Sequence, residues 1–176
     1  MNHLSKLIIV LILATLVSHA ENTSEKKCCA PVVTTDFGKL KQLIGKWEAM
    51  SKMSGKNQKV FVNYKLTSGG TALVETLFPG TPHEMVSVYT ADGGDLMMTH
   101  YCMLGNQPRL KVEESDQPNQ MKFEFDGGTG IKSSKDPHMH ALTITFIDPD
   151  HFRQEWAFFD GGKQKSVETL NFARAK

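Results

Sequence analysis

The chain has 176 residues, with 20 Lys and Arg against 19 Asp and Glu. That length suits one domain. The near-zero net charge offers no electrostatic case for binding nucleic acid or an anionic membrane surface.

The first twenty residues predict an export signal. Lys6 provides a positive start, residues 7–17 are uncharged and apolar, and Ser18-His19-Ala20 places small residues where a signal peptidase reads them. The apolar run is too short to cross a membrane, which takes roughly 20 residues. We therefore expect cleavage after Ala20, no membrane insertion, and a secreted or periplasmic protein.

Residues 21–35 are polar and lack periodicity, which predicts a disordered tail. This tail contains Cys28 and Cys29, while Cys102 lies far along the chain. Export permits a disulfide, and the odd number of cysteines leaves at least one thiol over. The sequence leaves open whether Cys102 bridges to the tail or is a small buried apolar residue.

Residues 36–176 predict one all-β domain behind a short helix. Asp36 is expected to cap a helix over residues 37–44, which Gly45 ends. Turn residues then recur at roughly ten-residue spacing, as in a barrel or sandwich. The expected strands are residues 46–54, 58–67, 71–78, 83–91, 95–104, 108–115, 119–126, 138–147, 151–159 and 163–174. With no crossover helix, the expected fold is a ten-stranded antiparallel up-and-down β-barrel, and a two-sheet sandwich is the alternative.

Alternation within the strands assigns their faces. Trp47 and Ala49 alternate with Lys46 and Glu48 along the first strand. One wet face and one apolar face suit a sheet that encloses its own interior. In the strand over residues 95–104 both faces are mixed, so the side that His100 faces stays open.

Two positions carry a family resemblance. Gly45-Lys46-Trp47 follows the short helix, and Arg174 shares its face of the last strand with Leu170 and Phe172. This resembles the lipocalin and wider calycin signature, in which a late Arg packs across the Trp of Gly-x-Trp at the closed end of the barrel. Ten strands resemble the fatty-acid-binding-protein and nitrobindin branch of that superfamily.

The middle of the chain resembles a family of exported lipocalin-like bacterial proteins of undescribed function. The resemblance lies in residues 75–80, 83–85 and, most distinctively, 99–109. It implies a fold and no activity.

Residues 99–109 also contain the chain's most varied set of reactive side chains, and they span a strand end and a turn. Barrel mouths bring such strand ends together. We expect an apolar cavity with His100, Arg109 and Glu84 selecting the ligand, and Arg109 pairing with a ligand carboxylate. The predicted ligand-binding residues are His100, Arg109, Glu84, Tyr64, Phe123, Phe125, His140 and Trp156. By alternation His140 shares its strand face with Leu142, Ile144 and Phe146, so it is expected to face the interior. Further cavity lining is expected from Val60, Val62, Met121, Leu142 and Ile144.

The predicted function is an exported binding protein for a small, mostly apolar ligand, and four alternatives stay open. His100 or His140 could hold haem, as in nitrobindin-like barrels. His138-Met139-His140 and the cysteines could bind copper, although no usual metal spacing is present and no metal site is assigned. His and Glu at the mouth could act as acid and base, although no catalytic motif supports an enzyme. The barrel could also be filled, with Arg109 paired internally to Glu75, Glu84 or Glu155.

Overall fold

The computed structural model describes residues 35–52 and 55–176. The predicted signal peptide, Cys28, Cys29 and almost all of the predicted tail lie outside the described residues. The described residues begin with helix α1 (Thr35–Leu40) and the 3-10 helix η1 (Lys41–Leu43). No helix among them is long and apolar enough to cross a membrane.

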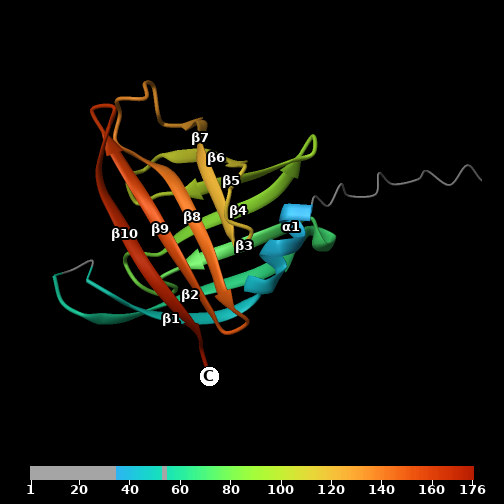
Figure 1. Cartoon of the computed structure of the whole chain (residues 1–176). Coiled ribbons are helices and arrows are strands. Elements are labelled where there is room, and N and C mark those ends of the chain that lie inside the picture. The colour runs from blue at the N-terminus through green and yellow to red at the C-terminus, as the bar shows by residue number, and fades with distance from the viewer. Residues whose placement is uncertain (1–34, 53–54) are drawn as a thin grey trace, which may run out of the picture. The chain divides into compact units, whose positions relative to one another are not determined.

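Ten antiparallel strands form a closed barrel (Figure 1). Each strand pairs with its neighbour in sequence, and pairing of the first with the last closes the ring. This is the predicted up-and-down barrel, and it excludes the sandwich. The strands are β1 (Gly45–Ser51), β2 (Gln58–Thr67), β3 (Ala72–Leu77), β4 (Met85–Asp92), β5 (Asp95–Tyr101), β6 (Gln107–Glu113), β7 (Gln120–Thr129), β8 (His138–Asp148), β9 (His151–Asp160) and β10 (Lys163–Arg174). A 3-10 turn, η2 (Ser68–Gly70), links β2 to β3.

The expected cap of the helix was wrong. The helix begins at Thr35, so Asp36 lies inside its first turn instead of preceding it. The Asp36 carboxylate pairs with Lys39 Nζ at 3.2 Å, and an acid in a first turn also suits the helix dipole.

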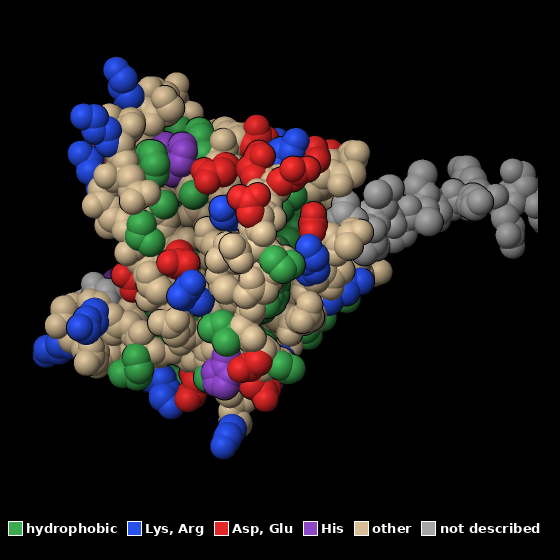
Figure 2. Space-filling model, viewed as in Figure 1, with side chains coloured by type: hydrophobic (Ala, Val, Ile, Leu, Met, Phe, Trp, Pro, Cys, Tyr) green, Lys and Arg blue, Asp and Glu red, His purple; other side chains and the backbone are tan. Residues whose placement is uncertain are grey.

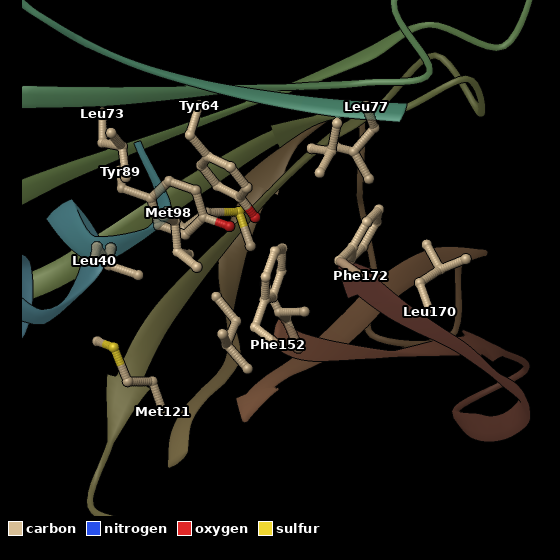
Figure 3. Packing of buried hydrophobic residues seen from close by; sticks show 14 of the residues in the cluster. Leu40, Tyr64, Leu73, Leu77, Tyr89, Met98, Met121, Phe152, Leu170 and Phe172 are labelled. Atoms are coloured by element: carbon tan, nitrogen blue, oxygen red, sulfur yellow. The ribbon is translucent and has the colours of Figure 1, made fainter. Parts of the chain in front are cut away.

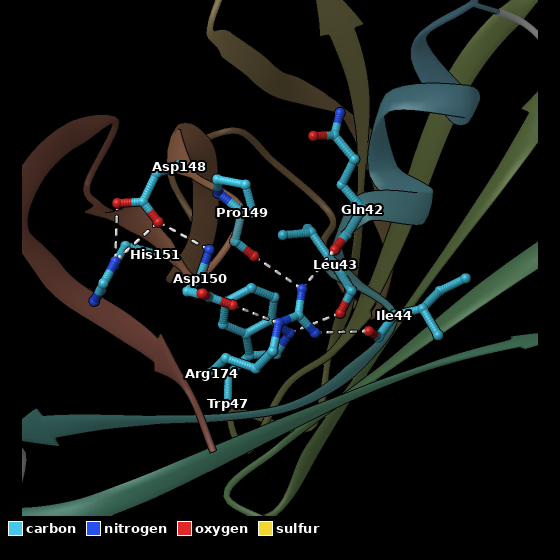
Figure 4. A network of polar contacts seen from close by, with 9 residues as sticks. All are labelled: Gln42, Leu43, Ile44, Trp47, Asp148, Pro149, Asp150, His151 and Arg174. Atoms are coloured by element: carbon cyan, nitrogen blue, oxygen red, sulfur yellow. Dashed lines mark hydrogen bonds and ion pairs between the residues drawn. The ribbon is translucent and has the colours of Figure 1, made fainter. Parts of the chain in front are cut away.

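One end of the barrel is closed around Trp47. Its indole Nε1 donates to the Leu43 carbonyl at 2.7 Å, and Phe152 meets the ring edge-on at 4.8 Å between centroids. The Arg174 guanidinium carbon lies 4.0 Å from the centre of the indole ring, within reach of a cation–π interaction. Figure 4 shows Arg174 lying over Trp47 as the sequence predicted.

Arg174 also ties three chain segments together at this end. Its guanidinium donates to the carbonyls of Gln42, Ile44 and Pro149, and to the Asp150 carboxylate. Gly45 starts β1 with a φ of +123°, and a Cβ there would lie 3.1 Å from Arg174 Nη1. A side chain at position 45 would therefore be strained and would crowd this contact.

The middle of the barrel is filled by one apolar cluster. Figure 3 shows part of this cluster, to which the helix contributes Leu40 and the strands contribute residues such as Met121, Phe152 and Phe172. Most residues predicted to face inward from β1, β2 and β7 are buried, whereas Leu66 and Phe125 are half-buried and Met53 lies outside the described residues. Val60, Val62, Met121, Leu142 and Ile144, expected to line a cavity, belong to this packed cluster.

The outer face is polar in the view of Figure 2, with acidic and basic side chains interspersed. Arg109 with Asp126 and Lys111 with Asp95 form two of the ion pairs on this surface, at 3.3 and 2.8 Å. These side chains are about half exposed, so the pairs add little stability.

Replacing Trp47 by Ala should lower the free energy of unfolding by about 3–5 kcal/mol, because the change removes a buried aromatic with three partners. Met50→Ala is the matched control on the same strand, since Met50 is 59% exposed. Urea unfolding of both variants checks this. A Trp47→Ala variant as stable as Met50→Ala would show that the closed end does not depend on the indole.

Candidate functional site

A fully buried carboxyl group lies in the middle of the barrel. Glu75 on β3 is 0% exposed. Its Oε1 accepts hydrogen bonds from the Tyr64 hydroxyl and from Gln154 Nε2, both at 2.6 Å, and its Oε2 accepts one from the Tyr89 hydroxyl at 2.8 Å. In Figure 3 the Tyr64 and Tyr89 hydroxyls point to the same place. Hydrogen-bond donors from three strands, β2, β4 and β9, thus converge on the Glu75 carboxyl group.

Strand register explains why these groups meet. Tyr64 pairs with Glu75, Glu75 with Ser87, and Ser87 with His100, so the four form a row across β2 to β5. Directly paired residues point to the same face of a sheet. Gln154 reaches the row from β9, and its Oε1 accepts from Trp156 Nε1 at 3.2 Å. We call Tyr64, Glu75, Ser87, Tyr89, His100, Gln154 and Trp156 the Glu75 network.

Burial and hydrogen bonding oppose each other at Glu75. Burial raises the pKa of its carboxyl, and hydrogen bonds from Tyr64, Gln154, Tyr89 and Ser87 act against this rise. Burial, together with the nearby Glu75 charge, raises the pKa of both tyrosines well above the usual value. Both phenols therefore remain protonated and able to donate.

Two members of the network, His100 and Trp156, line a cavity. His100 Nδ1 lies 3.0 Å from Ser87 Oγ, and the imidazole ring packs on Trp156 at 4.8 Å between centroids. His100 is 1% exposed. Burial lowers the pKa of its imidazole from 6.5 to about 4, so the ring is neutral near pH 7.

Beside His100 lies a hollow of about 280 Å³, which we call the mouth hollow. Its walls come from the ends of β3, β5 and β9 and the starts of β4, β8 and β10, so it opens at the end opposite Trp47 and Arg174. Its lining is mostly apolar, and Met103 and Leu104 at its rim are 53% and 52% exposed. The lining residues are Leu77, Phe78, Met85, His100, Cys102, Met103, Leu104, Met139, Trp156, Phe158, Ser166, Glu168 and Leu170.

Of the predicted ligand-binding residues, His100 and Trp156 line the mouth hollow. Tyr64 belongs to the Glu75 network behind it, and Phe123 packs in the core against Tyr89. The sequence left open which side of its strand His100 faces. In the structure His100 faces inward together with Leu96 and Met98, because all three are buried.

The structure does not bring Arg109 or Glu84 to the mouth hollow. Arg109 alternates with the buried Pro108 and Leu110, so it faces outward and pairs with Asp126. Asp126 is not one of the three internal partners that the sequence suggested for Arg109, which were Glu75, Glu84 and Glu155. Glu84 accepts a hydrogen bond from the Gly80 amide at 2.6 Å, within the loop between β3 and β4.

His140 and Phe125 form a separate aromatic cluster with His138 and Phe159. His140 stacks on Phe159 at 3.9 Å, and its Nδ1 lies 2.9 Å from His138 Nε2. The register of β8 against β9 shifts between Met139 and Ala141, so His140 is the extra residue of a bulge. The bulge breaks the alternation from which the sequence placed His140 on the same interior face as Leu142.

Ser87, Tyr89 and Gln154 were missed from the sequence. Glu75 shares its strand face with Leu73 and Leu77, and Gln154 shares its face with Phe152 and Trp156. A polar residue inside an apolar stripe needs a buried partner. Glu75 and Gln154 are two such polar residues on different strands, and together they could have predicted a buried polar network.

The described residues offer no good fit to haem or to a metal ion. Trp156 packs against the imidazole of His100, and no Lys or Arg among the described residues lines the mouth hollow to pair with propionates. These residues do not fit haem well. Cys102 is a half-buried thiol that forms no disulfide with another described residue. The described part of the chain contains no group of three or more His, Cys, Asp or Glu side chains placed to hold a metal ion.

Catalysis is poorly supported by the same geometry. Ser87 lies between Glu75 and His100 and is 0% exposed, so its hydroxyl is not available as a nucleophile. A pKa of about 4 leaves His100 a weak general base near neutral pH. The arrangement suits recognition of a bound molecule better than proton transfer.

No protein-family model matches the chain, and no curated protein matches it in sequence. Among solved structures it is similar to Rv2717c from M. tuberculosis, with a TM-score of 0.53 and 14% identity over 81% of this chain and 99% of that one. It is also similar to a protein of unknown function from the DUF3598 family of Nostoc punctiforme (TM-score 0.49, 12% identity, 77% of this chain) and to a redesigned β-barrel (TM-score 0.34, 13% identity, 77% of this chain and 94% of that one). This chain spans about half of the Nostoc protein, 49% of its length. The likeness to Rv2717c supports the barrel fold alone, and calycin membership stays a prediction.

The buried neutral His100 should make stability depend on pH in a defined window. The unfolded chain takes up a proton on this ring near pH 6.5, whereas the folded protein takes it up only near pH 4. The contribution is therefore fully present above about pH 6.5 and is lost as the pH falls toward 4, by roughly 3 kcal/mol in total. Unfolding free energies of wild type and His100→Gln, measured from pH 7.5 to 4, should converge or cross as the pH falls. Parallel curves would mean that His100 titrates normally in the folded state.

Proposed function

We propose that the protein is an exported binding protein that holds a small, mostly apolar molecule in the mouth hollow. The observation that carries this proposal is an apolar hollow with one buried, neutral imidazole in its wall. Ligand sites are typically concave and apolar with a few placed polar groups. Export rests on residues 1–20 of the sequence and is part of the proposal.

The size and position of the hollow limit the ligand. A volume of about 280 Å³ is at the small end for ligand sites. The packed cluster beneath it leaves the ligand at the mouth instead of deep inside the barrel. Exposed Met103 and Leu104 at the rim give an apolar approach, and the flexible methionines of the lining suit adaptation to different shapes.

N-phenyl-1-naphthylamine, an uncharged apolar fluorophore, tests the proposal. We expect saturable binding of one molecule per chain with a rise in fluorescence. Met139→Trp should fill the hollow, because Met139 lines it beside its strand partner Phe158, and should weaken binding by about tenfold or more, which corresponds to about 1.4 kcal/mol. Met50→Trp on the exposed outer face of β1 is the matched control and should bind as wild type does.

Cys102 gives an independent report on where the fluorophore binds. In a background with Cys28 and Cys29 replaced by Ser, bound fluorophore should slow the reaction of Cys102 with a maleimide. Non-saturable binding, or equal binding to both Trp variants with no protection of Cys102, would refute the proposal. A Soret band that appears on adding hemin and is lost in His100→Leu would favour the haem alternative instead.

A further inference from the structure

We propose that the ligand of the mouth hollow is a small amine whose ammonium group binds the Glu168 carboxylate and whose apolar body packs in the hollow. This inference rests on the proposed function and specifies the charge of its ligand. It follows from the place of Glu168 in the wall and from the charges that the wall lacks.

Glu168 lies on the face of β10 that lines the mouth hollow. Along this strand Leu170 and Phe172 are buried and Asn171 is exposed, so alternation turns Glu168 to the same inner side as the two apolar residues. Glu168 is half-buried, and both it and Leu170 line the hollow. A carboxylate in a mostly apolar wall loses hydration, which makes a partner there favourable.

The Glu168 carboxylate is only partly satisfied within the protein. Its Oε1 accepts a hydrogen bond from Ser51 Oγ at 3.1 Å, whereas no described residue donates to its Oε2. Among the described residues, the fully enclosed side-chain atoms without a partner are Asn106 Oδ1, Thr145 Oγ1 and Arg153 Nε. Glu168 Oε2 is not one of these, so it keeps open surface and can accept a hydrogen bond from a ligand.

The wall supplies no positive charge to balance Glu168. No Lys or Arg of the described residues lines the hollow, and their ion pairs do not include Glu168. Burial lowers the pKa of His100 to about 4, so its imidazole is neutral near pH 7. A ligand carboxylate, which Arg109 was expected to bind, would meet a like charge without a counter-ion, so an anionic ligand is disfavoured.

Trp156 adds the second part of an amine site. It is the strand partner of Glu168 across β9 and β10, and directly paired residues point to the same face of a sheet. Both residues line the hollow, so an aromatic ring and a carboxylate border the same space. Aromatic rings, and Trp above all, attract cations, while a carboxylate is a strong acceptor for an ammonium group.

The rest of the wall suits the body of such an amine. Met85, Met139 and Leu170 give it apolar surface. Glu168 is only half-buried, which keeps the desolvation cost of the two opposite charges modest. The expected ligand class is therefore small amines that are protonated at neutral pH and carry one alkyl or aryl body.

Displacement of N-phenyl-1-naphthylamine by three eight-carbon compounds near pH 7 tests the inference. Octylammonium carries a positive charge, 1-octanol carries none and octanoate carries a negative charge. We expect octylammonium to compete most strongly, although 1-octanol is the more apolar compound, and octanoate to compete most weakly.

Two matched variants separate the Glu168 contact from the charge of the whole protein. Glu168→Gln keeps the shape of the side chain and removes its charge, so the preference for octylammonium over 1-octanol should fall by about threefold to tenfold. Glu113→Gln removes the same charge from an exposed position on β6 and should keep the wild-type preference. Near-UV circular dichroism checks that both variants are folded.

Salt gives a second readout that needs no variant. Raising the ionic strength from about 0.01 M to about 1 M shortens the screening length from about 30 Å to about 3 Å. Competition by octylammonium should weaken over this range relative to competition by 1-octanol, because the contact with Glu168 is half exposed to solvent.

The outcomes distinguish the inference from the proposed function. Failure of the fluorophore itself to bind saturably refutes the proposed function. Saturable fluorophore binding with octylammonium competing no better than 1-octanol or octanoate overturns the inference and leaves the binding function standing. An unchanged preference in Glu168→Gln, or an equal fall in Glu113→Gln, also overturns it.

Discussion

The placement of one carboxyl group, Glu75, constrains much of this barrel. A buried acid without partners would cost several kcal/mol, and here donors from Tyr64, Tyr89 and Gln154 converge on it. Each donor comes from a different strand, and Gln154 on β9 reaches Glu75 from outside the row that Tyr64, Glu75, Ser87 and His100 form across β2 to β5. The network therefore requires this register and this closure, and it links the packed core to the wall of the mouth hollow.

The two ends of the barrel have different physical characters. Trp47 and Arg174 close one end, where Arg174 also satisfies the carbonyls of Gln42, Ile44 and Pro149. At the other end the strand termini leave an apolar hollow with His100 in its wall. The Trp47 end is thus closed by many contacts, and the proposed binding site lies at the His100 end, an arrangement typical of binding sites that sit on a rigid scaffold.

Much of the fold could be predicted from the sequence, because turn residues and alternation are local signals. Most strand limits agree within a few residues, and the Trp47–Arg174 contact was confirmed. The site was harder to predict. Arg109 was expected at the mouth by composition, but its strand alternation turns it outward. His140 was placed by alternation that a bulge interrupts, and bulges leave little local trace in a sequence. Gln154 meets Glu75 only through barrel closure, a long-range fact that no spacing encodes.

The central claim is that the apolar hollow beside His100 and Trp156 is the place where this barrel binds a small molecule. The most direct test is NMR of the methionine methyl groups during a titration with N-phenyl-1-naphthylamine. The account predicts shifts for Met85, Met103 and Met139, which line the hollow, and none for Met50 on the outer face of β1. Shifts at Met50 alone, or no shift at any of the three lining methionines, would contradict it.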